Sequence, residues 1–133
     1  MNILVIDGQG GRIGREVIER IKAEGIDGVV TAIGTNSIAT AAMLKGAADL
    51  AATGENAVRV NARSADVIIG PIAIVVADAL LGEITPDMAV AVGQSPAKKL
   101  LIPTGHCNNT VIGVADYSIK ALLCGVIDAL KAL

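Results

Sequence analysis

The chain has 133 residues, enough for one domain with one hydrophobic core. Apolar residues make up 53% of it and charged residues 18%, a balance that predicts an apolar surface covered by another subunit. A net charge of −2, with no Phe and no Trp, argues against nucleic-acid binding. The sequence has neither a secretory signal nor an apolar run of the roughly 20 residues that span a membrane. We therefore expect a cytoplasmic protein that binds neither nucleic acid nor membranes.

Short β-branched runs alternate with helical patterns in the first half of the chain. Residues 2–6, Asn-Ile-Leu-Val-Ile, form a short run that is apolar after Asn2 and is followed by Asp7-Gly8, as in a strand buried on both faces. Ile13, Val17 and Ile21 recur every four residues among charged ones, which predicts an amphipathic helix. The elements expected up to residue 69 are strands over 2–6, 29–33, 49–52 and 66–69, and helices from 11 to 25, from the cap residues 35–37 to 44, and after the cap residues 53–56.

The second half continues the alternation. Residues 72–81 have a helical composition but are apolar on almost every side, and Thr85-Pro86 starts the next helix. The elements expected after residue 70 are helices over 72–81, over 87–92 and from the cap Asp116 to the C-terminus, and strands over 99–102 and 111–114. This order predicts a doubly wound, mainly parallel α/β sheet with helices on both faces, a Rossmann-like fold in one domain over residues 1–133.

Glycines are concentrated where the first strand turns into the first helix. Without side chains, backbone N–H groups can approach a phosphate, and a helix N-terminus favours an anion. The spacing is Gly8-x-x-Gly11-x-x-Gly14 with Gly10 in addition, not the strict G-x-G-x-x-G, because Ile13 occupies the sixth position. Two interpretations stay open: a tight turn that lets the helix pack closely, or a phosphate-binding loop. The residues of that loop are Gly8, Gln9, Gly10, Gly11, Arg12, Ile13 and Gly14.

The end of the second strand bears on which nucleotide such a loop would hold. A dinucleotide site places an acidic residue about 20 positions after the glycines, on the adenosine ribose. Here the segment is Gly34-Thr35-Asn36-Ser37, which contains no Asp or Glu and counts against NAD. NADP is permitted, because Asn36 and Ser37 would meet its 2′-phosphate, although the loop has no arginine. The cofactor is therefore predicted as NADP, NAD or another nucleotide.

Polar loops follow several other predicted strands. The carboxyl ends of parallel strands share one edge of the sheet, where ligands bind at the switch point of the strand order. The residues that would extend the site there are Thr35, Asn36, Ser37, Glu55, Asn56, Gly70, Pro71 and the segment 104–109. In the alternative interpretation, with equal weight, Asn36, Ser37, Glu55 and Asn56 are only helix caps and turn formers.

No set of residues points to a reaction, and the catalytic residues stay unknown. His106 is the only histidine, and its neighbour Cys107 faces the opposite way in an extended chain, which disfavours a Cys-His pair. Cys107 and Cys124 with one histidine do not supply a zinc site, and we expect both thiols to be reduced. Asp78 lies inside an apolar run and is interpreted as a structural charge rather than a catalytic acid.

Four blocks of sequence together resemble a family of small bacterial proteins described as a domain of unknown function. The blocks are residues 5–14, 34–43, 52–57 and 69–72, of which Gly-Thr-Asn-Ser and Thr-Gly-Glu-Asn are the most specific. The resemblance covers nearly the whole chain and implies no reaction.

The glycine loop alone is also similar to that of dihydrodipicolinate reductases, in which Gly-x-x-Gly-x-x-Gly followed by Arg binds the nicotinamide dinucleotide. Gly8, Gly11, Gly14 and Arg15 match that pattern. The similarity ends after about 20 residues, and those enzymes have a separate substrate domain that 133 residues do not provide. It implies a cofactor site more than a reductase.

Three functions follow from these observations. The first is a ligand-binding or regulatory protein that holds a phosphate-bearing nucleotide or dinucleotide. The second is a small NAD(P)-dependent oxidoreductase or nucleotide-using transferase whose site is completed by a second subunit. The third is a structural or interaction module without a ligand. In each case we expect a homo-oligomer, formed through residues 72–81 because a helix that is apolar on every side must be covered on every side.

Overall fold

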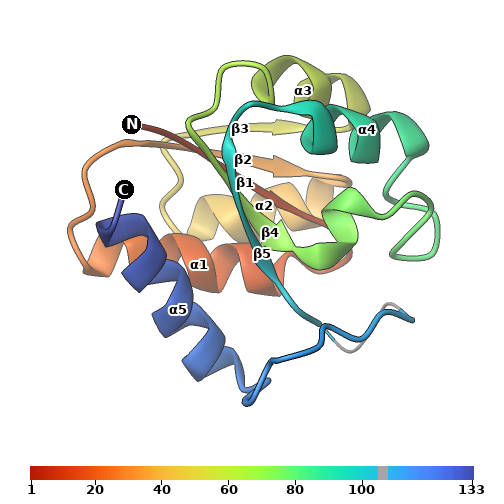
Figure 1. Cartoon of the computed structure of the whole chain (residues 1–133). Coiled ribbons are helices and arrows are strands. Elements are labelled where there is room, and N and C mark those ends of the chain that lie inside the picture. Colours follow the sequence, from red (N-terminus) through yellow and green to blue (C-terminus); the bar gives the residue numbers. More distant parts are fainter. Residues whose placement is uncertain (105–107) are drawn as a thin grey trace.

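The computed structural model of the chain describes residues 1–104 and 108–133. The protein is an α/β structure with a central sheet (Figure 1). In chain order the elements are β1 (Asn2–Asp7), α1 (Arg12–Ala23), β2 (Val29–Gly34), α2 (Ser37–Lys45), β3 (Leu50–Thr53), α3 (Glu55–Asn61), β4 (Val67–Pro71), the 3₁₀ helix η1 (Ile72–Val75), α4 (Pro86–Gln94), β5 (Lys98–Ile102) and α5 (Ile119–Lys131). None of the helices in these two ranges is both long enough and apolar enough to cross a membrane.

The sheet has five strands in the order β3-β2-β1-β4-β5, and every neighbouring pair is parallel. β1 pairs with β2 along its whole length, from Asn2 opposite Val29 to Asp7 opposite Gly34, and with β4 on its other side. The predicted Rossmann-like class is therefore confirmed. The order of the strands changes direction between β1 and β4, so the switch point lies at the carboxyl ends of these two central strands.

Side chains of β1 alternate between two hydrophobic layers, as the pleat of a strand requires. Ile3 and Val5 pack with residues of α1, α2 and α5, whereas Leu4 and Ile6 pack with residues of α3, α4 and η1. Figure 1 shows the same division, with α1, α2 and α5 on one face of the sheet and α3 and α4 on the other. All four side chains are at most 2% exposed, which explains the uninterrupted apolar run in the sequence.

Helix boundaries follow the predicted caps in most places. Asn36 caps α2 by accepting the N–H of Ala39, and Thr85 caps α4 just before Pro86. The C-terminal helix differs, because its cap is Ser118 and not Asp116. The Asp116 carboxylate instead accepts the backbone N–H of Ser118 at 2.8 Å and fixes the residue that caps the helix.

The predicted helix over residues 72–81 is wrong. Only Ile72–Val75 is helical, as a short 3₁₀ turn, and residues 76–83 form successive turns. A uniformly apolar run specifies no period, and here Ile74 is buried in the core while Leu81 is 98% exposed. Because this run is not a helix that is apolar on every side, its sequence pattern no longer requires a second subunit to cover it. Self-association stays a prediction.

The predicted strand over residues 111–114 is also wrong. This segment forms a turn, with Gly113 at a φ of 92° and Ile112 90% exposed. Four residues with three β-branched side chains resemble a short strand, but a glycine in the left-handed region breaks the extended backbone. Within the described ranges, β5 is the last strand of the sheet on its side.

Candidate functional site

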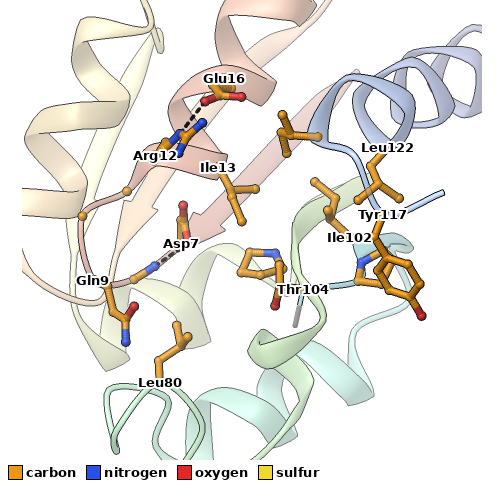
Figure 2. A pocket seen from close by; sticks show the side chains of 16 residues that line it. Asp7, Gln9, Arg12, Ile13, Glu16, Leu80, Ile102, Thr104, Tyr117 and Leu122 are labelled. Carbon is orange, nitrogen blue, oxygen red and sulfur yellow. Dashed lines mark hydrogen bonds and ion pairs between the residues drawn. The ribbon is translucent and has the colours of Figure 1, made fainter. Parts of the chain in front are cut away.

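A cavity of about 350 Å³ lies at the carboxyl ends of β1, β4 and β5 (Figure 2). This is the switch point of the sheet, where open α/β proteins bind ligands. Figure 2 shows Asp7, Gln9 and Arg12 on one side of the cavity and Ile102, Tyr117 and Leu122 on the opposite side. The lining residues are Asp7, Gly8, Gln9, Gly10, Gly11, Arg12, Ile13, Glu16, Pro71, Leu80, Ile102, Pro103, Thr104, Tyr117, Ile119 and Leu122.

Gly11 and Gly14 allow α1 to pack closely against its neighbours. Gly11 has a φ of 69°, and a Cβ atom placed there would lie 2.6 Å from the carbonyl oxygen of Ala39 in α2. At Gly14 a Cβ atom would lie 2.5 Å from the sulfur of the buried Met43. Both contacts are too short for a real Cβ atom, so the fold itself requires these two glycines.

Gly8 and Gly10 differ in the space that the protein leaves for a Cβ atom. A Cβ atom at Gly8 would lie 2.8 Å from the side chains of both Thr35 and Leu80. At Gly10 it would meet nothing within 4 Å, and the φ of Gly10 lies outside the left-handed region. Packing therefore explains Gly8, Gly11 and Gly14, whereas Gly10 has no such explanation within the protein.

Asp7 places a buried carboxylate beneath the loop. Its side chain accepts the N–H of Gly8 at 2.8 Å and the N–H of Gly14 at 2.7 Å, and the residue is only 5% exposed. Burial raises the pKa of Asp7, and the two backbone hydrogen bonds oppose that rise. The first turn of α1 already contains an anion of the protein itself, so the Gly14 amide is not free for a ligand.

Glu83 supplies a second internal anion, on the β2 side of the loop. One carboxylate oxygen, Oε1, accepts the backbone N–H of Gln9 at 2.9 Å, the hydroxyl of Thr35 at 2.7 Å and the side-chain amide of Asn36 at 2.6 Å. Burial alone would raise the pKa of Glu83, but these three hydrogen bonds outweigh it and the pKa is lowered. Glu83 is therefore held as a charged carboxylate.

The donors left for a ligand lie in the middle of the loop. The backbone N–H groups of Gly10 and Arg12 have no hydrogen-bond partner within residues 1–104 and 108–133. The Arg12 guanidinium is 82% exposed and is bonded through Nε to Glu16 at 2.8 Å, which leaves its terminal nitrogens at the cavity mouth. The opposite wall is mainly apolar. The arrangement therefore offers two amides and one cation to an anionic group, and an apolar surface to the rest of a ligand.

The structure brings together some of the predicted site residues and separates others. Those that line the cavity are Gly8, Gln9, Gly10, Gly11, Arg12, Ile13 and Pro71. Thr35 and Asn36 reach the glycine loop through Glu83. Those outside the cavity lining are Gly14, Ser37, Glu55, Asn56 and Gly70.

The separated residues have local structural roles. Ser37 is the exposed first residue of α2. Glu55 accepts the hydroxyl of Thr85 at 2.5 Å and so joins α3 to the cap of α4. Gly70 lies against the carbonyl oxygen of Ile6, where a side chain would not fit.

The α5 side of the cavity was missed by sequence reasoning, except for Thr104 in the predicted loop 104–109. Tyr117 lies just before the cap of α5, and Ile119 and Leu122 belong to the first turn of that helix. Asp7 was also missed, although an acidic residue between a buried strand and a glycine loop is a usable signal. Neither Asp7 nor Glu83 reveals its burial or its partners in the sequence.

Other candidate residues lie away from the cavity or outside the described ranges. The predictions for His106 and Cys107 fall on residues that the structure does not describe. Asp78 was expected as a helical structural charge, but it is exposed in a turn with a φ of 64°. Arg15 pairs with Glu19 at 2.7 Å and does not line the cavity. Within the described ranges, no group of three or more His, Cys, Asp or Glu side chains is placed to hold a metal ion.

The fold and the cavity define a Rossmann-like α/β protein with a glycine loop at the switch point of its sheet. The chain belongs to the family described as Domain of unknown function (DUF3842), whose model matches residues 2–133. No curated protein matches the sequence.

A similar solved structure is the crystal structure of a dodecameric FMN-dependent UbiX-like decarboxylase from Escherichia coli O157:H7, with a TM-score of 0.45 and 15% sequence identity. The match covers 98% of this chain and 76% of that one. Similarity at this level does not identify a ligand.

Proposed function

We propose that this protein binds a compact phosphate-bearing ligand, best represented by a mononucleotide, in the cavity at the carboxyl ends of β1, β4 and β5. The observation that supports the proposal is the pair of unpartnered amides at Gly10 and Arg12, with the Arg12 guanidinium at the same end of the cavity. A phosphate would accept these N–H groups and meet the cation. The apolar wall on the α5 side would contact the uncharged part of the ligand.

The size and shape of the cavity favour a mononucleotide over NAD or NADP. Its volume of about 350 Å³ is near the lower end of the range for small-molecule sites, roughly 300–1,000 Å³. A dinucleotide would extend its adenosine toward the end of β2, where Thr35 and Asn36 are bonded to Glu83. The proposed ligand therefore carries the predicted phosphate but is smaller than the predicted dinucleotide.

Thermal unfolding with a ligand panel tests the proposal. The panel is AMP, ADP, FMN, NAD, NADP and, as the compound without phosphate, adenosine. A mononucleotide at 100 times its Kd would stabilise the protein by about 2.7 kcal/mol and raise Tm by roughly 8 °C, while adenosine would have no effect. If no phosphorylated compound raises Tm by a degree at millimolar concentration, the cavity is not a phosphate site.

Two substitutions locate the site once a ligand is found. Gly10→Ala would weaken binding at least tenfold, because its methyl group blocks the approach of a phosphate to the loop amides. Arg12→Gln would weaken it by a similar factor by removing the cation. Arg20→Gln is the matched control, since Arg20 lies on the same helix and pairs with Glu24, but does not line the cavity. Equal affinities for the Arg12 and Arg20 variants would place the ligand elsewhere.

A further inference from the structure

Three hydrogen-bond donors from two separate segments converge on one oxygen of Glu83. Gln9 belongs to the glycine loop, whereas Thr35 and Asn36 follow β2. Their N–H, O–H and amide groups lie 2.6–2.9 Å from Oε1. The other carboxylate oxygen, Oε2, has no hydrogen-bond partner among the described residues. Such a set of donors around a single oxygen is suited to any carboxylate or phosphate group, not to glutamate alone.

The segment that supplies Glu83 is held by short-range backbone hydrogen bonds among its own turns, and its side chains Ala79 and Leu80 pack against the core. Residues 76–83 are turns, in which Asp78, Leu80 and Leu81 have φ values of 64°, 56° and 57°. Non-glycine residues adopt this left-handed conformation only at a cost in free energy. Ile84 is buried and its carbonyl accepts the N–H of Asp78 at 2.8 Å, which closes the base of the segment.

Leu80 connects this segment to the cavity. It lines the cavity wall and lies against Gly8, three residues before the carboxylate that fills the donor set. If Glu83 left its three donors, the same movement would take Leu80 from the wall and extend the cavity toward the end of β2. The cavity and the donor set are therefore neighbouring parts of one surface.

We propose that the Gln9 amide, the Thr35 hydroxyl and the Asn36 side chain form a second anion subsite, in which the Glu83 carboxylate is the resident anion that a carboxylate or phosphate group of the ligand replaces. The identity of that ligand rests on the function proposed above. The existence of the subsite is independent of that function, because a free anion is enough to test it. Glu83 thereby sets a threshold: a ligand with a single anionic group fills the cavity alone, whereas one with a second anionic group displaces the segment.

Acetate is the probe, because it has the carboxylate of Glu83 without the chain. Glu83→Ala leaves the three donors without their acceptor. We expect 100 mM sodium acetate, compared with sodium chloride at equal ionic strength, to raise the Tm of this variant by roughly 4 °C, as for a Kd of about 10 mM, and to leave the wild type unchanged. Glu19→Ala is the matched control, since Glu19 is exposed and, among the described residues, its side chain is bonded to Arg15 alone. The double variant Glu83→Ala/Thr35→Val lacks one donor and would lose most of the acetate effect.

A second measurement does not depend on the folding of Glu83→Ala. Glu83→Gln keeps the shape and the acceptor oxygen but loses the charge, so acetate would shift the Gln9 amide NMR signal at lower concentration in this variant than in the wild type. Equal responses in the two proteins, or an acetate effect on Tm that Thr35→Val leaves intact, would overturn the subsite. Failure of every nucleotide to bind, with the acetate effect present, would overturn only the proposed function.

Discussion

Gly10 and Gly11 are neighbours in the loop, yet we expect an alanine to destabilise the protein strongly at Gly11 and hardly at all at Gly10. An alanine at position 11 must adopt a φ of 69°, which costs about 1–2 kcal/mol, and its Cβ would overlap the backbone of Ala39 at 2.6–2.7 Å. Overpacking of this kind costs about 1–3 kcal/mol, so Gly11→Ala would lose about 2–5 kcal/mol in total. Gly10→Ala has neither penalty and would change stability by less than about 0.5 kcal/mol.

Urea unfolding followed by circular dichroism measures both changes, and thermal unfolding checks them. At roughly 3 °C per kcal/mol, Gly11→Ala would lower Tm by roughly 6–15 °C, while Gly10→Ala would leave it within about 2 °C. Stabilities of the two variants that agree within 0.5 kcal/mol, about the scatter among surface substitutions, would refute the close approach of the loop to α2. If Gly11→Ala is destabilised as expected, a loss of ligand binding in that variant does not locate the site. A loss of binding in the stable variant Gly10→Ala would locate it.

Three further substitutions test other parts of the structure. Gly93→Ala in α4 meets nothing within 4 Å and would raise the free energy of unfolding by about 1 kcal/mol, measured in urea. Thr85→Ala would lose about 1–2 kcal/mol because Thr85 caps α4 through Met88, and Thr85→Ser would restore most of it. The pKa of Asp7 is raised from 3.8, chiefly by burial, so its contribution to stability is complete below that pH and is lost as the pH rises through the folded value. In urea titrations from pH 4 to pH 7, the wild type would therefore lose stability relative to Asp7→Asn. A difference in the free energy of unfolding that does not change with pH would contradict a raised pKa of Asp7.

The sequence predicted the parallel sheet because its strongest signals are local and agree with one another. Residues 3–6 are apolar at every position, and this part of β1 is buried on both faces. Asn36, Thr85 and Pro86 mark helix starts through hydrogen bonds and backbone angles that need no distant partner. Such elements can be identified without knowing the fold, because burial and capping leave a pattern in a few consecutive residues.

The segment 72–81 shows where this reasoning stops. Its composition allows a helix, and nothing in these ten residues encodes a preference for turns. The outcome depends on Ile74 entering the core beside Leu4 and Ile6, and on Glu83 reaching donors more than 45 positions earlier in the chain. Tertiary contacts of this range override a local propensity that is weak.

The same limit explains the incomplete prediction of the site. The glycine loop was predicted because its residues are contiguous, and Pro71 because it ends a strand at the switch point. Leu80, Tyr117 and Leu122 come from distant segments whose sequences suggest only core packing or turns. Thr35 and Asn36 were predicted as ligand-binding residues, which stays a prediction, and in the structure their donor groups bond to Glu83.

The regularly spaced glycines of the motif are not the residues that offer donors to a ligand. Gly8, Gly11 and Gly14 lie three residues apart, and each is in close contact with other parts of the protein, so their spacing alone is no evidence for a ligand. Gly10 breaks the spacing, and no internal contact accounts for it. The free amides of Gly10 and Arg12 flank Gly11, whose own N–H donates to the Gly8 carbonyl at 2.9 Å. The proposal of a ligand thus rests on the two amides beside Gly11, and a motif search that scores only the regularly spaced glycines would not detect them.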